Sequence, residues 1–516
     1  MSVDKLRGSY HVNRVSPNEI GLLLSAQSYR PAVTKAINKI KEGEWRTLQS
    51  LISNVISPGP HPKYDGDYPC LKTKNVQDLI AETSPADWAD ISEISDLSKV
   101  QVGKGDLLIN LTGAGSIGRV SVYYGDDLPI TNQHIAKMSP NNLIDEGYLV
   151  AYLRSFYAER ALEQGVAGST GQINMVNDHV RCTPVRICHS SAQKYIGEKV
   201  RQAERLRAWA KSIYEEAEAS FANCVLKLGY CEEPKQSYGW SSLQDRLDPA
   251  FYDSKFSFLD SEQFKNNSIP LKKFIVEGAY GVLPDSSSYG TGNKRFIRAT
   301  DLVFSNINPK CFLSVPVDQV KEKAEIKEGD ILLEIKGAIK ECELAGSHLE
   351  GSYVNGSVYR FSVEGIDKGY LCFYLKSFLK QLYCERVSVN NIIAYLDQEG
   401  IYSLPILRLT AEIEESFGFA YKQYVDAQRV IFRLTAIAKL LVENLIEGAV
   451  SEAELIAAQQ ALEAGDDSLD RALIERMTAE GIDGDGDPLF DDIDQLYDLL
   501  EQAKQALDAD DTMAEA

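Results

Sequence analysis

The chain has 516 residues, of which 44% are hydrophobic, so it is long enough for about three domains with packed cores. No apolar run approaches the roughly 18 residues of a membrane span, and the first residues lack the apolar centre and cleavage site of a signal peptide. The nine cysteines are scattered, without a C-x-x-C pair or a zinc-binding spacing, as is usual in a reduced compartment. We therefore expect a cytoplasmic protein that holds no metal.

The net charge of −21 is concentrated at one end of the chain. Residues 449–516 contain 20 Asp and Glu against 3 Lys and Arg, a net charge of −17, so the preceding 448 residues are close to neutral at −4. A nearly neutral body can still present local basic patches, so the overall charge does not exclude DNA as a partner.

The chain contains a tandem duplication. Residues 105–113 (GDLLINLTG) match 329–337 (GDILLEIKG) at an offset of 224, and 147–155 (GYLVAYLRS) match 369–377 (GYLCFYLKS) at an offset of 222. The offset drifts by only a few residues over about three hundred. A repeat of this length indicates two copies of one structural plan.

Each copy predicts an α+β globule followed by a helix. Branched and aromatic residues predict strands at 106–111, 120–124 and 331–335. One helix is predicted over 148–163 in the first copy and one over 370–386 in the second. A linker rich in Pro, Gly and Ser is predicted at 234–240.

Two long helices close the two copies, at residues 196–228 and 413–445. Steps of three and four residues along each helix give an apolar seam that only Arg207 interrupts, a pattern typical of helices that pair along their length. Each helix is about 50 Å long at about 1.5 Å per residue. We predict an antiparallel coiled coil whose seam includes Ile196, Val200, Ala203, Ala210, Phe221, Ile413, Phe417, Ile431, Leu434, Leu441 and Leu445.

The acidic tail after Gly448 contains two short helical patterns, at 452–463 and 493–507. Apolar residues between Leu489 and Leu500 give this acidic segment an apolar face. Two interpretations stay open for the tail: an element that docks a partner, or a flexible solubilising segment.

Two motifs suggest ligands but fit them poorly. Residues 113–118 (GAGSIG) match the phosphate-binding G-x-G-x-x-G pattern, but a strand-like run follows where that motif requires a helix. We interpret these glycines as a turn between strands. Residues 483–487 (DGDGD) resemble the start of a calcium loop, but Pro488 occupies the position of the required glycine. No catalytic arrangement is apparent, so we predict a chain that is not an enzyme and binds no cofactor itself.

Polar residues suited to DNA recur at matching places in the two copies. In the first copy they are Lys72, Lys74, Asn75, Thr112, Ser116, Arg119, Asn132, Gln133, His134, Ser169, Thr170 and Gln172. In the second copy they are Lys294, Arg295, Arg298, Lys336, Lys340, Asn355, Ser388, Asn390 and Asn391. Arg, Asn and Gln read base edges, while Lys, Ser and Thr position phosphates. Ordinary turn polarity explains any single residue equally well, so the prediction depends on the whole set.

The duplicated order resembles the DNA specificity (S) subunit of type I restriction-modification systems. In this chain the order is a strand, the segment GDLLI, the glycine turn, the segments TNQHI, YLxxYLRS and GSTGQIN, a proline and a long helix. The resemblance covers residues 1–448. The second copy replaces Asn-Gln-His by Asn-Gly-Ser and lacks the Thr and two glycines of the turn, as two copies that read different sequences would.

The resemblance implies two target recognition domains, at 1–190 and 233–408. Spacer helices at 191–232 and 409–448 would set the gap between two half-sites on double-stranded DNA. It also implies methyltransferase (M) subunits that bring S-adenosylmethionine and methylate adenine, with or without a restriction (R) subunit. Two alternatives remain: a protein-binding adaptor whose acidic tail docks a partner or mimics DNA, and, less favoured, an enzyme that binds a nucleotide at the glycine turn.

Overall fold

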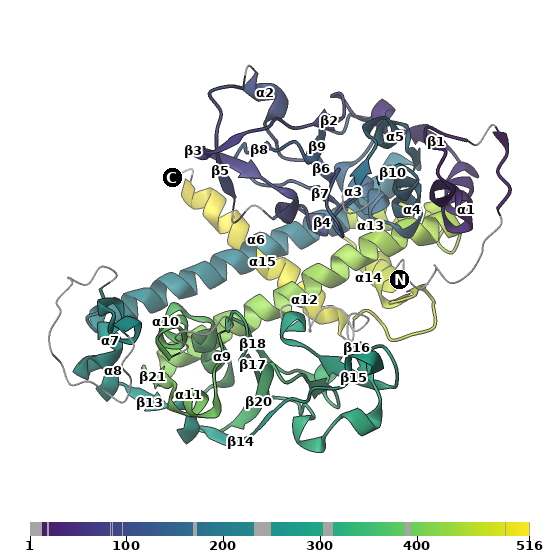
Figure 1. The fold of residues 1–516 in the computed structure, drawn as a ribbon. Helices are drawn as coiled ribbons and strands as arrows, with labels where there is room; N and C mark the ends of the chain where they lie inside the picture. Colours follow the sequence, from purple (N-terminus) through teal and green to yellow (C-terminus); the bar gives the residue numbers. More distant parts are fainter. Residues whose placement is uncertain are drawn as a thin grey trace. The chain divides into compact units, whose positions relative to one another are not determined.

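The computed structural model describes residues 13–17, 20–82, 84, 86–94, 96–168, 173–231, 249–302, 313–387, 394–490 and 492–514. Figure 1 shows its helices and strands. None of the helices in these ranges combines the length and the apolar composition that a membrane span requires. The predicted linker at 234–240 lies outside them.

The chain divides into two compact units. Unit 1 comprises Met1–Arg207 and Val430–Ala516, and unit 2 comprises Ala208–Arg429. The two predicted long helices are present as α6 (Ser190–Lys227) and α12 (Ala411–Glu447), and each contributes one part to each unit. Both units therefore contain a globule and a segment of each long helix.

Each globule is built from short strands and short helices. In unit 1 the strands are β1 (Trp45–Thr47), β2 (Ser57–Pro58), β3 (Lys63–Leu71), β4 (Leu79–Ile80), β5 (Asp87–Asp90), β6 (Leu107–Asn110), β7 (Val120–Val122), β8 (Ile130–Thr131), β9 (Ile135–Met138), β10 (Val166–Ala167), β11 (Asn174–Met175) and β12 (Pro184–Arg186). The short helices of this globule are α1 (Pro31–Lys41), α2 (Leu97–Val100), α3 (Glu146–Leu153), α4 (Phe156–Glu163) and α5 (Asn177–Cys182).

In unit 2 the strands are β13 (Ser268–Pro270), β14 (Ile275–Tyr280), β15 (Lys294–Ile297), β16 (Leu313–Val315), β17 (Ile331–Glu334), β18 (Cys342–Leu344), β19 (Tyr353–Val354), β20 (Val358–Val363) and β21 (Pro405–Leu407). The short helices are α7 (Ser257–Asp260), α8 (Glu262–Asn266), α9 (Lys368–Lys376), α10 (Phe378–Val387) and α11 (Gln398–Ser403).

Three sheets of unit 1 have counterparts in unit 2, although the main sheet of unit 1 has one additional strand, β4. The main sheet has the order β2-β9-β6-β7-β4 in unit 1 and β14-β20-β17-β18 in unit 2. A second sheet has the order β5-β3-β8 in one and β16-β15-β19 in the other, and in both its last pair is parallel. A third sheet pairs β1 with β12 and β13 with β21. The strands predicted at 106–111, 120–124 and 331–335 are confirmed as β6, β7 and β17.

Two tyrosines tie each short helix to its third sheet. The hydroxyls of Tyr148 and Tyr152 on α3 donate to the carbonyls of Arg186 and Pro184 at 2.9 and 2.8 Å. In unit 2 the hydroxyls of Tyr370 and Tyr374 on α9 donate to the carbonyls of Leu407 and Pro405, both at 2.6 Å. All four rings are buried, so each hydroxyl needs this partner.

The single helix predicted over 148–163 is wrong, because the chain breaks at Ser155. Its backbone is extended, with φ −72° and ψ 156°, and its hydroxyl accepts from the Ala158 amide at 3.4 Å. Serine at such a break caps the next helix, α4. The second copy breaks at the equivalent Ser377, with φ −68° and ψ 161°, so the helix predicted over 370–386 is also two helices.

A pair of glycines lets each short helix approach its long helix. A Cβ on Gly147 would lie 2.7 Å from the Gly197 Cα, and one on Gly369 would lie 2.6 Å from the Gly418 carbonyl oxygen. Backbones at this distance leave no room for a side chain. Both copies therefore share a close contact between the backbones of the short helix and the long helix.

In unit 2 the two long helices lie side by side and run antiparallel. The rings of Tyr214 and Tyr424 lie 4.7 Å apart, and those of Phe221 and Phe417 lie 5.7 Å apart. Residue numbers therefore increase along one helix in the direction in which they decrease along the other. Phe221 and Phe417 also contact Phe373 on α9, which places the helix pair on the core of the globule.

Most residues of the predicted seam are buried. The buried ones are Ile196, Val200, Ala203, Ala210, Phe221, Phe417, Leu434 and Leu441. The others, Ile413, Ile431 and Leu445, are only partly buried. On α12 the neighbouring Val430, Ile437 and Val442 are buried instead, so the apolar face there is broader than a single seam.

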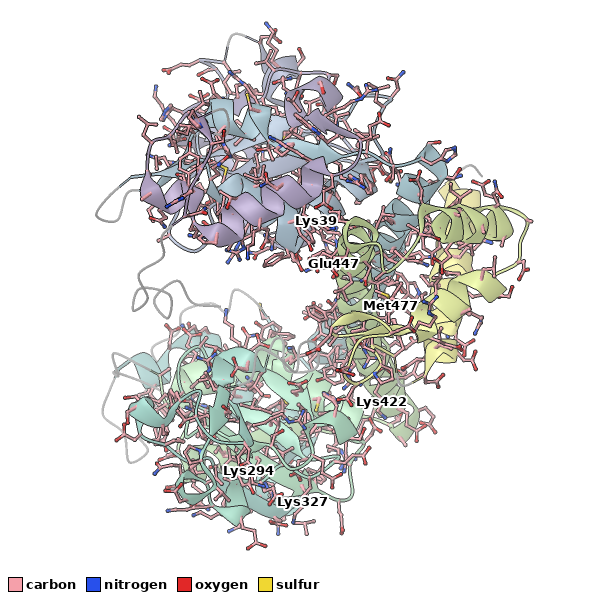
Figure 2. All side chains as sticks on the ribbon, turned by 90° about the vertical axis from the view of Figure 1, so that its right-hand side faces the viewer. Lys39, Lys294, Lys327, Lys422, Glu447 and Met477 are labelled. Carbon is pink, nitrogen blue, oxygen red and sulfur yellow. The ribbon has the colours of Figure 1, made fainter. Side chains whose placement is uncertain are left out.

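The acidic tail is folded onto unit 1. It forms α13 (Glu452–Glu463), α14 (Ser468–Glu475), the hairpin of β22 (Met477–Thr478) and β23 (Gly481–Ile482), and α15 (Ile493–Ala514). Met477, labelled in Figure 2, is buried in this hairpin. The apolar residues Phe490, Leu496 and Leu499 are also buried. The apolar face of the tail thus packs within the chain, and the interpretation as a flexible segment is wrong for its described residues.

One buried ion pair joins the tail to α6. The Asp470 carboxylate accepts from the Lys199 ammonium at 2.5 Å, from the Tyr195 hydroxyl at 2.6 Å and from the Tyr497 hydroxyl at 2.7 Å. The side chains of Lys199 and Asp470 are 0% and 2% exposed. Burial opposes ionisation of Asp470, but the Lys199 charge and these hydrogen bonds outweigh it and lower its pKa below the ordinary value.

Candidate nucleic-acid interface

The first group of candidate residues sits where β3 ends in a short 3₁₀ turn, Thr73–Asn75. The Asn75 side chain accepts from the Lys72 amide at 2.9 Å and donates to the Glu82 carbonyl at 2.9 Å. Asn75 is 2% exposed, so the structure gives it a role in shaping the turn and not in contacting a ligand. The turn leaves the Lys74 side chain half exposed and that of Lys72 partly exposed.

The glycine turn connects β6 to β7, as interpreted from the sequence. The two strands are antiparallel, and Gly113, Gly115 and Gly118 all have positive φ, a backbone conformation that glycine adopts without strain. The motif therefore begins no helix and offers no helical N-terminus to a phosphate. Ser116 and Arg119 lie on this turn, and the Arg119 guanidinium donates to Gln77 at 3.4 Å.

Asn132, Gln133 and His134 form the tight turn between β8 and β9. The Asn132 carboxamide oxygen accepts from the His134 amide at 3.1 Å, which fixes the turn. The His134 ring then lies between Thr112, at 2.9 Å from Nδ1, and the Gln133 amide, at 3.1 Å from Nε2. The structure thus joins the glycine turn to this second turn, although 22 residues separate Thr112 from His134.

Tyr64 and Asp87 complete this surface, and neither residue was predicted from the sequence. The Tyr64 hydroxyl accepts from the Asn132 amide at 3.2 Å, and the Lys72 ammonium lies 3.5 Å from the centre of the Tyr64 ring. Asp87 on β5 lies 3.3 Å from the Lys72 ammonium and 2.9 Å from that of Lys74. Tyr64 is 46% exposed. The available signal for it in the sequence was an aromatic residue in a strand-like segment that contains or precedes lysines.

We call this surface the first polar face. Its members are Tyr64, Lys72, Lys74, Asp87, Thr112, Ser116, Arg119, Asn132, Gln133 and His134. Contact with Lys74, and then with Lys72, lowers the pKa of Asp87 below its ordinary value, so this carboxyl stays ionised at neutral pH. The face offers ammonium groups for phosphates, amide and hydroxyl groups for base edges, and a ring for stacking.

The second copy repeats the backbone of the first turn with different side chains. Asp301 accepts from the Arg298 amide at 2.8 Å, as Asn75 does from Lys72. Its carboxylate also accepts from the Arg298 guanidinium, at 3.0 Å from Nε and 2.8 Å from the terminal nitrogen. Lys294, labelled in Figure 2, lies 5.7 Å from the Tyr353 ring, and Arg295 donates to the Glu350 carbonyl at 3.5 Å.

The second copy also repeats the turn of Asn132. The Asn355 carboxamide oxygen accepts from the Ser357 amide at 2.6 Å, and the Asn355 carbonyl accepts from the Val358 amide at 2.8 Å. Asn132 and Asn355 therefore have the same structural task. This task explains why both copies have asparagine at this position.

The turn between β17 and β18 differs from the glycine turn. Gly337 has a φ of 114°, but Ile339, which stands where the first copy has Gly115, has a φ of 51°. A left-handed β-branched residue is strained by about 1 to 2 kcal/mol. Its side chain is 2% exposed, so burial offsets the strain. Lys336 and Lys340 flank it and are exposed.

Several candidate residues lie outside the described part of the chain. They are Ser169, Thr170, Gln172, Ser388, Asn390 and Asn391. Among the described residues, no group of three or more His, Cys, Asp or Glu side chains is arranged to hold a metal ion.

No protein-family model and no curated protein matches the sequence. Several solved structures are similar to this chain. The S subunit of a type I restriction-modification system from M. genitalium is 13% identical, with 78% of this chain and 96% of that chain covered and a TM-score of 0.41. The HsdS subunit from Thermoanaerobacter tengcongensis is 14% identical, with 79% and 97% covered and a TM-score of 0.28.

A third similar structure belongs to work on complex assembly and conformational transition of the type I restriction-modification system. It is 13% identical, with 83% of this chain and 97% of that chain covered and a TM-score of 0.26. The chain is thus similar to type I S subunits over most of its length.

Proposed function

We propose that this chain is the DNA-recognition subunit of a type I restriction-modification system. Each globule reads one half of a split target in double-stranded DNA. The chain performs no chemistry itself and holds no cofactor. Partner methyltransferase subunits bring S-adenosylmethionine and methylate adenine, with or without a restriction subunit, and the complex works in the cytoplasm.

One observation supports this proposal most strongly: matched backbones with unmatched side chains. Arg298 stands where the first copy has Lys72, and Ser357 stands where it has His134. Two readers of different base sequences must differ in the side chains that face the bases.

The chemistry of the first polar face suits DNA. Lys72 and Lys74 are placed for phosphates, which set position but carry no sequence information. Gln133, His134 and Thr112 form one hydrogen-bonded group that can exchange its internal partners for base edges. Partial exposure of all three side chains makes that exchange sterically open.

The long helices suit a spacer. α6 has 38 residues, so its length is about 57 Å at about 1.5 Å per residue. At about 3.4 Å per base pair this length corresponds to between one and two turns of duplex. We propose that the helix pair sets the unread gap and carries the surface on which the methyltransferase subunits dock.

The alternative is an adaptor whose globules bind protein and whose acidic tail docks a partner or mimics DNA. Phe490, Leu496 and Leu499 are buried within the chain, so such a tail would have to engage its partner through its acidic groups. An adaptor should leave no sequence-dependent footprint on DNA even with its partners present, whereas the proposed subunit should leave a bipartite one.

Single-molecule mapping of N6-methyladenine across a genome tests the proposal. Deleting the gene should remove one split motif with a fixed gap. Exchanging the first globule for that of a related protein should change one half of the motif only. An unchanged methylation map after deletion would refute the proposal.

A further inference from the structure

One carboxylate faces both lysines of the first polar face. Asp87 lies 3.3 Å from the Lys72 ammonium through Oδ1 and 2.9 Å from the Lys74 ammonium through Oδ2. The Oδ2 atom is inaccessible to water. Two cations that contact the same carboxylate are neutralised in part before any DNA arrives.

The backbone holds this carboxylate in place. Asp87 opens β5 and is paired with Cys70, two residues before Lys72 on the chain. Lys72 also contacts Tyr64, with the ammonium 3.5 Å from the centre of the ring. Neither lysine therefore projects freely into solvent, although both ammonium groups are near the surface.

The second copy places a carboxylate against the equivalent cation by a different route. In β16, Leu313 pairs with Phe296 as Asp87 pairs with Cys70, so this position has no acid. Asp301, three residues after Arg298, binds the guanidinium instead. Both copies thus pair the cation at this turn with an acid, although the acid comes from different elements.

We propose that Asp87 is a positioning residue that weakens sequence-independent binding of DNA by restraining Lys72 and Lys74. The inference rests on the proposed function and deepens it. A phosphate must displace Asp87 from the lysines, so phosphate contact alone contributes little to binding. Contacts with the correct bases, made beside these lysines by the rest of the face, then decide whether the lysines transfer to the DNA backbone.

The physical basis is that phosphate contacts supply most sequence-independent affinity. An acid that competes for the lysines lowers this part of the affinity while it leaves base contacts unchanged. Random DNA, which offers no matching bases, is therefore bound weakly.

The test is fluorescence anisotropy of the full chain with a labelled duplex of arbitrary sequence, over about 50 to 200 mM salt. Asp87→Asn should bind this duplex about 3 to 10 times more tightly than the unmodified chain. The slope of log affinity against log salt should become steeper by about one, because one more phosphate contact releases counterions.

Two controls separate this role from a general change of charge. Asp126→Asn removes the same charge from an exposed loop of the same globule, where Asp126 is 96% exposed and lies 3.7 Å from Lys104. It should change the affinity much less than Asp87→Asn does. Adding Lys72→Gln and Lys74→Gln to Asp87→Asn should abolish the gain in affinity and restore the shallower slope.

Equal affinities for the Asp87→Asn and Asp126→Asn chains would overturn the inference, as would a gain that persists without the two lysines. Absence of binding by every variant would also overturn it, because two released lysines on a DNA surface must attract DNA. None of these results bears on the methylation map, which decides the proposed function separately.

Discussion

The Lys199–Asp470 pair is expected to hold the acidic tail on unit 1, and Asp470→Asn tests this. The substitution keeps the shape of the side chain but leaves the Lys199 ammonium buried without its counter-charge. Breaking a buried ion pair in this way costs about 3 to 5 kcal/mol. Tyr195 and Tyr497 would also lose a charged acceptor. A loss of this size is enough to release the tail locally.

Limited trypsin digestion measures this release. The tail contains only Arg471, Arg476 and Lys504 as cleavage sites, so its fragments are identified by mass. Cleavage at these sites should be much faster in Asp470→Asn, because proteolysis follows the population of the open form. Replacing both partners, with Lys199→Met and Asp470→Leu, should be less damaging, since no buried charge remains.

Glu463→Gln is the matched control. It breaks the Lys194–Glu463 pair, which also joins the tail to α6 but has both side chains about half exposed. Exposed pairs contribute little, so cleavage should be unchanged. If Asp470→Asn were cleaved no faster than Glu463→Gln, the reasoning about the buried pair would be wrong.

The same pair predicts the pH dependence of tail attachment. The pKa of Asp470 in the folded chain lies below its ordinary value, which is about 3.9 in an unfolded chain. Its contribution is therefore fully present above about pH 4 and is lost as the pH falls through the folded-state pKa. The difference in urea stability between the unmodified chain and Asp470→Asn should be constant near neutral pH and shrink in acid.

Three further outcomes are expected. Gly147→Ala should destabilise unit 1 by about 1 to 3 kcal/mol in urea unfolding, because its Cβ meets the Gly197 backbone; Gly103→Ala, whose Cβ would meet nothing closer than 3.8 Å, is the control. His134→Ala should lose about 1 to 3 kcal/mol of discrimination at one base pair of one half-site, read as a relaxed position in the methylation map; relaxation in both halves would contradict one reader per globule. Removing two heptads from both long helices should shorten the unread gap by about 6 base pairs with the half-sites unchanged; altered half-sites with an unchanged gap would refute the spacer.

The polar positions were harder to interpret from the sequence than the strands. Asn132 and Asn355 look like base-reading amides, yet their carboxamide oxygens are used by the turn itself. Asn75 is ambiguous in the same way, because an asparagine that caps a turn and one that reads adenine occur in similar local sequences. Only burial and hydrogen-bond partners distinguish the two tasks.

The duplication, the long helices and the strand pattern could be predicted from the sequence because each depends on local order. A repeat offset of 222 to 224 residues and an apolar period are properties of neighbours along the chain. The tertiary structure decided which side chains from distant segments contact one another. It paired Asp87 with Lys72 across a sheet, and it buried Asp470 against Lys199, 271 residues away. A carboxylate in the sequence carries no sign of the cation it will meet, because that partner is chosen only when distant segments pack together.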